Sequence, residues 1–210
     1  MSVAKLPIAV LISGTGRSLK NLIDKINAGD LDADIRVVNA STTRAKGLQY
    51  AEKAMIPIEI IERSGFGSAK DFSNAVFKRC EEAGVKYVIM AGYLQLLPVP
   101  EKFDNRVVNI HPSLIPSFCG KGFYGHRVHE AALNYGVKVS GCTVHFVNDQ
   151  YDSGPVILQK TVPVLDTDTP ETLNDRVFYE AECVAYPEVI QLLAEGRVSV
   201  NGRRVTIRRD

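Results

Sequence analysis

The sequence predicts an α/β fold with an open, mostly parallel, twisted sheet and helices on both faces. Short apolar runs of strand length alternate with segments of helical periodicity through the first half of the chain, as in parallel sheets with right-handed crossovers. These runs are continuously apolar, which is typical of strands buried on both faces. A closing pattern of alternating residues adds a C-terminal β-hairpin to this prediction.

The chain begins with a strand, a glycine-rich turn and a helix. Residues 7–12 form the first apolar run, and Ser13-Gly-Thr-Gly16 follows it directly. Apolar residues then recur at helical spacing until Gly29, a residue type common just after helix ends. The same order continues with strands expected at 35–38, 58–61 and 87–91 and helices at 45–54 and 68–83.

The second half predicts a different arrangement. We expect a short strand at 106–110, a helix at 125–135, and strands at 142–147 and 156–164 whose antiparallel pairing would give a mixed sheet. Residues 168–171 supply a capping residue and a proline at the first helical position. We expect Pro187 to interrupt that helix and Gly196 to end it. In the tail, Asn201-Gly202 between alternating residues predicts the hairpin.

Composition limits the class of protein. The 210 residues are 45% hydrophobic and carry no linker or repeat, so we expect one domain over residues 1–210. A formal net charge of +1 argues against nucleic acid as a partner. The four dispersed cysteines predict neither a zinc site nor disulfides, and no segment resembles a signal peptide or a membrane span. We expect a cytoplasmic protein that binds neither membrane nor metal and that is either a monomer or a homodimer.

The first turn is a candidate anion site. Gly16, Arg17 and Ser18 stand where a helix begins, and backbone N–H groups and the helix dipole attract anions such as phosphate there. The turn lacks both the third glycine of a dinucleotide fingerprint and the Lys-Ser/Thr of a P-loop. The alternative is that the glycines only make a tight turn.

A second candidate site follows the strand expected at 106–110. Asn109 and His111 are two residues apart, so their side chains share one face of the strand. Acyl transfer passes through a tetrahedral species that needs an oxyanion donor and a proton acceptor, and an amide and an imidazole supply both. A supporting carboxylate could be Asp149 or Asp152, and spacing does not choose between them. The alternative is a structural pair held by hydrogen bonds.

Four stretches resemble the phosphoribosylglycinamide formyltransferase family, and together they span nearly the whole chain: Ile12-Ser-Gly-Thr-Gly-Arg-Ser-Leu19, Ala91-Gly-Tyr-Leu-Gln-Leu-Leu97, Asn109-Ile-His-Pro-Ser-Leu-Ile-Pro116 and His145-Phe-Val-Asn-Asp-Gln-Tyr-Asp-Ser-Gly-Pro155. The resemblance implies a Rossmann-like formyltransferase of purine synthesis, with 10-formyltetrahydrofolate as the formyl donor and phosphoribosylglycinamide as the acceptor. Departures are Arg17-Ser18 for the usual Ser-Asn, Leu94-Gln95 for the usual Met-Arg, and a longer stretch at 120–125.

The resemblance also implies the site residues. Asn109, His111 and Asp152 would be catalytic, and the phosphoribosyl substrate would bind in the N-terminal half to Gly16, Arg17 and Ser18, with Glu182 at its ribose. Folate would bind mainly in the C-terminal half, to Lys70, Leu94, Gln95, Leu96, Leu97, Asn109, Asn148, Asp149, Gln150, Tyr151 and Asp152. His129 of the helix at 125–135 would either line the site or be a core or surface residue, and no role is assigned to His126, His145, Cys119 or Tyr124.

Other functions remain open at this stage. A methionyl-tRNA formyltransferase, a sugar-nucleotide formyltransferase or a formyltetrahydrofolate hydrolase would share the Asn, His and Asp residues, but each normally carries an extra domain. A non-catalytic module that binds a phosphoribosyl ligand would keep only the glycine turn.

Overall fold

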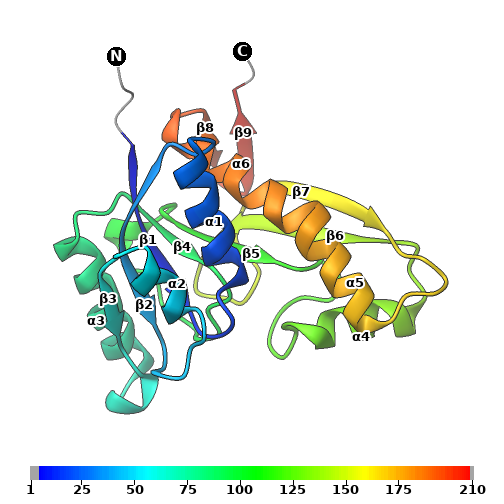
Figure 1. Cartoon of the computed structure of the whole chain (residues 1–210), viewed down its shortest axis with the longest axis horizontal. Coiled ribbons are helices and arrows are strands. Elements are labelled where there is room, and N and C mark those ends of the chain that lie inside the picture. The colour runs from blue at the N-terminus through cyan, green and yellow to red at the C-terminus, as the bar shows by residue number, and fades with distance from the viewer. Residues whose placement is uncertain (1–4, 209–210) are drawn as a thin grey trace.

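The computed structural model describes residues 5–208 as a seven-stranded sheet with helices on both faces and a separate hairpin (Figure 1). The sheet order is β3-β2-β1-β4-β5-β6-β7. Its strands are β1 Leu6–Ile12, β2 Ala33–Ala40, β3 Ile58–Ile60, β4 Tyr87–Met90, β5 Val107–His111, β6 Val139–Phe146 and β7 Val156–Pro163. Strands β1 to β5 pair in parallel, whereas β6 pairs antiparallel with both β5 and β7. The predicted fold class and the antiparallel pair are confirmed, while the single domain over 1–210 stays a prediction.

The helices expected from periodicity are present. They are α1 Arg17–Ala28, α2 Leu48–Lys53, α3 Ala69–Glu82, α4 His126–Tyr135, α5 Pro170–Arg176 and α6 Cys183–Ala194, with a π-helical segment η3 Val177–Glu182 between the last two and short 3-10 turns η1 Arg63–Gly65 and η2 Glu101–Phe103. Thr169 caps α5 through a reciprocal bond pair with Thr172. Among residues 5–208, no helix is both long and apolar enough to cross a bilayer.

The continuous apolar runs reflect burial on two sides. On β1, Ile8, Val10 and Ile12 pack into the cluster that includes α1 and α6. The intervening Ala9 and Leu11 pack with Phe72 and Val76 of α3 on the opposite face. Because successive side chains of a strand point to opposite faces, this double burial explains why β1 shows no alternation.

The strand order reverses between β1 and β4. From β1 the chain moves outward through β2 and β3, and then crosses back to place β4 and β5 on the other side of β1 (Figure 1). In open α/β sheets, ligands bind beyond the carboxyl ends of the strands at such a reversal. The Tyr186 hydroxyl of α6 fastens this region, because it lies 2.9 Å from the Met90 carbonyl of β4 and 3.1 Å from the Val108 carbonyl of β5.

The prediction that Pro187 interrupts the last helix is wrong. Helix α6 continues through Pro187, and the irregular segment is the π-helical η3, which precedes α6. A proline inside a helix removes the N–H that would bond the carbonyl four residues earlier. Here that carbonyl belongs to Cys183, and it accepts a hydrogen bond from Asn21 Nδ2 of α1 at 3.2 Å. A neighbouring helix thus replaces the missing donor.

The hairpin turn and the start of α2 are among the boundaries that differ from expectation. The hairpin strands are β8 Val198–Asn201 and β9 Arg204–Ile207, and Asn201 pairs with Arg204, so the two turn residues are one position later than expected. Helix α2 begins after Gly47 rather than at residue 45. A Cβ on Gly47 would lie 2.8 Å from Gly16 Cα, so the chain before α2 is packed against the first glycine turn.

Candidate active site

One cavity of about 800 Å³ collects most of the residues singled out from the sequence. It lies at the carboxyl ends of β1, β4 and β5, at the reversal of strand order. Its lining includes Gly14, Gly16, Arg17, Ser18, Leu94, Gln95, Leu96, Leu97, Asn109, His111, Asn148, Gln150, Tyr151, Asp152, Phe178 and Glu182. The glycine turn and the strand that carries Asn109 and His111 therefore open into one space, which is large enough for small-molecule ligands.

The glycine turn presents an uncapped helix start to this cavity. Gly16 has a left-handed φ of 72° and makes no side-chain cap for α1. A Cβ at Gly16 would lie 2.4 Å from Gly47 Cα, so both φ and the close approach require glycine. Ser13 joins this turn to the loop after β4, because its Oγ accepts the Leu94 N–H at 3.0 Å. The first N–H groups of α1 remain available for an anion.

Arg17 is held against the late helical segment. Its guanidinium lies 3.8 Å above the centre of the Phe178 ring and 2.9 Å from Asp175 Oδ1. These contacts join the start of α1 to α5 and η3, and they keep one positive charge at the end of the cavity that holds the glycine turn. Arg17 therefore adds positive charge beside the helix start, and Asp175 offsets part of that charge.

Glu182 is an acidic group in the same part of the cavity. Burial raises the pKa of its carboxyl to about 7, although the nearby Arg17 lowers it in part. Phe178 and Glu182 are four residues apart on η3, and both line the cavity. A carboxyl group that titrates near neutral pH is unusual and is more frequent at functional sites than elsewhere.

The raised pKa predicts how stability depends on pH. In the unfolded chain Glu182 loses its proton near pH 4.5, whereas in the folded protein it does so near pH 7, so stability falls as pH rises through this window. Glu182→Gln removes this titrating group. The free energy of unfolding of the variant relative to the wild type should therefore rise by about 1–3 kcal/mol between pH 4.5 and pH 7.5. Urea unfolding at both pH values measures this, with exposed Glu180→Gln as the control. An advantage of Glu182→Gln that does not change with pH would contradict it.

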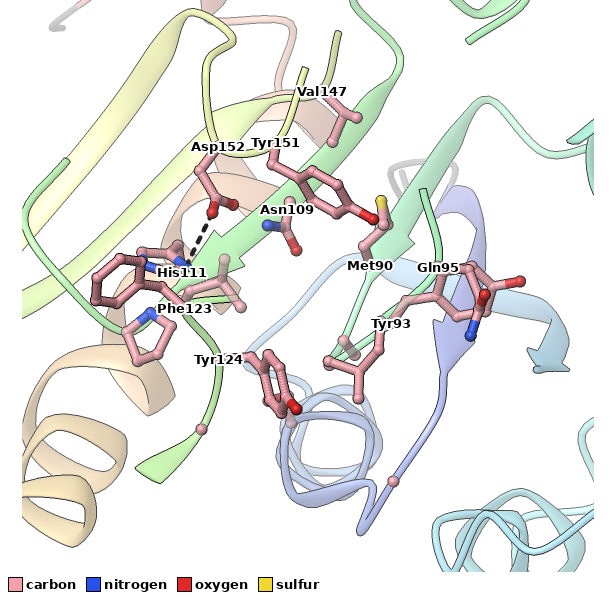
Figure 2. A pocket seen from close by; sticks show the side chains of 18 of the residues that line it. Met90, Tyr93, Gln95, Asn109, His111, Phe123, Tyr124, Val147, Tyr151 and Asp152 are labelled. Carbon is pink, nitrogen blue, oxygen red and sulfur yellow. Dashed lines mark ion pairs between the residues drawn. The ribbon is translucent and has the colours of Figure 1, made fainter. Parts of the chain in front are cut away.

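Asn109, His111 and Asp152 come together at the other end of the cavity (Figure 2). His111 Nδ1 lies 3.6 Å from Asp152 Oδ2, and His111 Nε2 lies 2.9 Å from the Phe118 carbonyl oxygen. The imidazole is almost fully buried, with 4% of its surface exposed. Both ring nitrogens face oxygen acceptors, an arrangement that suits a histidine able to carry a second proton.

The loop that carries Asp152 is tightly constrained. Asp152 adopts a left-handed φ of 51°, a conformation that aspartate tolerates better than most residues and that often marks functional sites. Its Oδ2 accepts the Gly120 N–H at 2.8 Å. Asp149 Oδ1 instead accepts the Val99 N–H at 3.3 Å and is not part of the cavity lining. Of the two carboxylates that spacing left open, the structure brings Asp152 to His111.

Sequence reasoning missed one member of this cluster. His145 of β6 pairs directly with Asn109 of β5 in the antiparallel register, and its Nε2 lies 3.3 Å from Asn109 Nδ2 and 3.8 Å from Asp152 Oδ1. The alternation along the strand places His145 on a face, but only the register between β5 and β6 shows which residue it meets. Phe123 and Tyr124 of the 120–125 stretch also line the cavity, and Tyr124 stacks beneath Arg127.

The loop after β4 and the loop after β6 form an apolar side of the cavity. Leu97 is buried, Leu94 is exposed, and Tyr151 lies between Asp152 and Met90 (Figure 2). Lys70 is exposed on the first turn of α3 and is not part of the lining. A folate contact from Lys70 or Asp149 therefore stays a prediction. His126 lies at the cavity and pairs with Glu171, whereas His129 is buried outside the lining.

The fold and this cluster define a protein of the formyl transferase class, and the chain belongs to the formyl transferase family, which matches residues 6–190. Members of this family use a folate-derived formyl donor. Within residues 5–208, no group of three or more His, Cys, Asp or Glu side chains is arranged to hold a metal ion.

Particular relatives are phosphoribosylglycinamide formyltransferases. The chain is 35% identical to that enzyme from Haemophilus influenzae, over 91% of this chain and 88% of the relative. It is 42% identical to the trifunctional purine biosynthetic protein adenosine-3 of Gallus gallus, over 93% of this chain but 19% of that protein, so it spans about a fifth of that relative's length. The solved structure of glycinamide ribonucleotide transformylase 1 from Symbiobacterium toebii matches with a TM-score of 0.90 and 41% identity, over 97% of this chain and 94% of that one.

Proposed function

We propose that this chain transfers the formyl group of 10-formyltetrahydrofolate to the amine of phosphoribosylglycinamide, a step of de novo purine biosynthesis. One observation carries the proposal: a single cavity has an uncapped helix start at one end and the Asn109, His111 and Asp152 cluster at the other. A phosphorylated substrate bound by the first end would extend its other end toward the second. The names of the relatives agree with this reaction.

The phosphoribosyl end would bind at the glycine turn. The N–H groups of Arg17 and Ser18 would hold the phosphate together with the helix dipole, and the Arg17 guanidinium would add charge. Glu182 would accept hydrogen bonds from ribose hydroxyls as a carboxylate. Because its carboxyl titrates near pH 7, binding of this substrate should strengthen as pH rises through that value.

The folate would occupy the apolar side of the cavity. Its pterin ring would lie between the 94–97 loop and the 148–152 loop, where Leu94 and Leu96 would supply apolar surface and backbone groups would supply hydrogen bonds. Gln95 lines this side where the family usually has arginine. The amide can hydrogen-bond but offers no charge, so the free energy of folate binding should be weaker by on the order of 1 kcal/mol than with arginine.

The chemistry needs charge stabilisation and one proton carrier. 10-Formyltetrahydrofolate supplies an activated formyl group on its N10 nitrogen. Asn109 would donate an N–H to the formyl oxygen as negative charge develops there. The attacking amine must lose a proton and N10 must gain one, so a single group near both can accept the first and return the second. His111 would be this group, since it lines the cavity beside Asn109 and Asp152.

His111 would exchange this proton through Nδ1. Its Nε2 is within hydrogen-bond distance of the Phe118 carbonyl oxygen, at 2.9 Å, whereas the 3.6 Å from Nδ1 to Asp152 is too long for a direct hydrogen bond. The Nδ1 atom therefore has no direct hydrogen bond to Asp152, and the substrate amine or a water molecule would be its partner in the reaction. The Asp152 carboxylate would stabilise the imidazolium while His111 carries the proton.

A formyl-transfer assay tests the proposal directly. The purified chain is mixed with 10-formyltetrahydrofolate and phosphoribosylglycinamide, and we expect formylated product and tetrahydrofolate in equal amounts by mass spectrometry and absorbance. The same mixture without acceptor should release almost no formate. Formate release without acceptor would instead indicate hydrolysis of the donor. This control is needed because the chain also resembles a formyltetrahydrofolate deformylase of Burkholderia mallei, with 28% identity and a TM-score of 0.83.

Other outcomes would point to the remaining alternatives. Formylation of methionyl-tRNA or of an amino sugar nucleotide, in place of phosphoribosylglycinamide, would identify a different acceptor. Binding of phosphoribosylglycinamide without any turnover would indicate a non-catalytic module. The free thiols of Cys80, Cys119, Cys142 and Cys183 support a reducing compartment such as the cytoplasm. We propose that the protein acts on small-molecule substrates and binds neither nucleic acid nor membrane.

A further inference from the structure

His145 is nearly inaccessible beneath the catalytic cluster and has no role in the steps above. It has 1% of its surface exposed and stands opposite Asn109 across the β5 to β6 ladder. The register between β6 and β7 shifts between Val144 and His145, and such bulges commonly redirect a side chain beside an active site. Burying an imidazole is unfavourable unless its nitrogens have partners.

The protonation state of His145 follows from its partners. Nδ1 lies 2.8 Å from the Phe146 carbonyl oxygen, which can only accept, so Nδ1 carries a proton. Burial lowers the pKa of His145, and His111 adds to this effect, while the Phe146 carbonyl and Asp152 oppose it. The net lowering favours the neutral ring. A neutral ring protonated on Nδ1 has a bare Nε2, which is an acceptor.

The bare nitrogen determines the orientation of the Asn109 amide. Nε2 faces Asn109 Nδ2 at 3.3 Å, and only the amide nitrogen can donate to it. Figure 2 shows this amide nitrogen on the side of the His111 and Asp152 pair and the amide oxygen on the opposite side. If Nε2 carried a proton, it would donate to the Asn109 oxygen or to Asp152 Oδ1, 3.8 Å away, and the amide would turn over.

We propose that His145 is a positioning residue: its Nε2 accepts one Asn109 N–H and so directs the second N–H toward the formyl oxygen beside His111. This inference rests on the proposed function for its catalytic meaning. The orientation itself depends only on the contacts of His145. A histidine buried solely for packing would leave the Asn109 amide free to adopt either orientation. The tautomer of His145 and its coupling to Asn109 therefore distinguish a positioning role from a packing role.

The tautomer is measured without any substrate. In the ¹⁵N-labelled protein, imidazole long-range correlation spectra should show His145 neutral and protonated on Nδ1 at pH 7, with its signals assigned by their loss in His145→Gln. This tautomer is the less populated one for histidine in water, so its presence reports the Phe146 contact. A ring protonated on Nε2, or on both nitrogens, would overturn the proposal whether or not the chain transfers formyl groups.

The coupling to Asn109 is measured by a double-mutant cycle in the full chain. His145→Leu should lower kcat by about tenfold or more with both KM values nearly unchanged, and it should cause no further loss in Asn109→Ala. His145→Gln keeps an acceptor at the end of the side chain and should recover most of the loss. His129→Leu removes another buried imidazole that shares no hydrogen bond with Asn109, and its effect should be equal in both backgrounds.

Each result has a distinct meaning. Equal losses from His145→Leu in the wild-type and Asn109→Ala backgrounds would overturn the proposal, as would a His145→Leu variant with normal kcat. If His145→Leu does not fold, the tautomer of His145 decides in place of the cycle. If the wild-type chain shows no formyl transfer, the proposed function fails, and the tautomer alone decides whether His145 fixes the amide.

Discussion

A His111→Ala variant should bind both substrates but lose formyl-transfer turnover by a factor of ~10² to 10⁴. The reason is that the proposed reaction moves a proton from the amine to N10, and His111 lines the cavity with Nδ1 3.6 Å from the Asp152 carboxylate. The loss should appear in kcat and not in KM, because the ring is buried and contributes little binding surface. Steady-state kinetics and equilibrium binding of phosphoribosylglycinamide measure the two quantities.

The supporting carboxylate provides the matched comparison. Asp152→Asn keeps the shape of the side chain but removes the charge 3.6 Å from His111 Nδ1, so kcat should also fall by ~10² or more. Asp149→Asn, three residues earlier in the same loop, should leave kcat within about threefold because Asp149 contacts Val99 and not His111. Normal turnover in both His111→Ala and Asp152→Asn would defeat the assignment of the catalytic cluster.

A Gly154→Ala variant should be strongly destabilised and inactive. A Cβ at Gly154 would lie 1.8 Å from the Phe146 carbonyl oxygen and 2.7 Å from the Phe146 carbonyl carbon. Both are backbone atoms of β6, so no side chain can move aside to make room. The same carbonyl accepts the His145 Nδ1 proton. We expect a loss of about 3 kcal/mol or more and a Tm lower by roughly 10 °C.

The control for this variant is Gly65→Ala. A Cβ at Gly65 would meet no atom within 4 Å, and Gly65 lies in η1, away from the cavity lining. Its Tm and kcat should stay close to the wild-type values. Thermal unfolding and the formyl-transfer assay measure both variants. A Gly154→Ala protein with normal stability and turnover would show that the β6 backbone can move away from the loop.

Local patterns predicted most of the fold because they depend on neighbours in the sequence. Burial of β1 on both faces follows from one apolar run, and the start of α5 follows from a capping residue and a proline. The error at Pro187 has a non-local cause, since the Cys183 carbonyl bonds to Asn21 of another helix. A local rule about proline cannot include a donor that is far away in the sequence.

The candidate site was predicted in part for the same reason. The period of a strand puts Asn109 and His111 on one face, and the glycine turn precedes a helix, so both could be identified from the residues. Spacing could not choose Asp152 over Asp149, a choice that only the family resemblance implied, and no pattern indicated that His145 contacts Asn109. Both depend on the register of β5 with β6 and on the path of the loop that follows β6.

The sequence by itself determined the alternating strands and helices, the helix start suited to an anion, and the amide and imidazole on one strand. These follow from side-chain periodicity, backbone preferences and residue chemistry within short segments. Only the tertiary structure decided that these segments share one cavity, that Asp152 faces His111, and that His145 contacts Asn109. Such contacts join residues that are dozens of positions apart, and their geometry is set when the sheet packs.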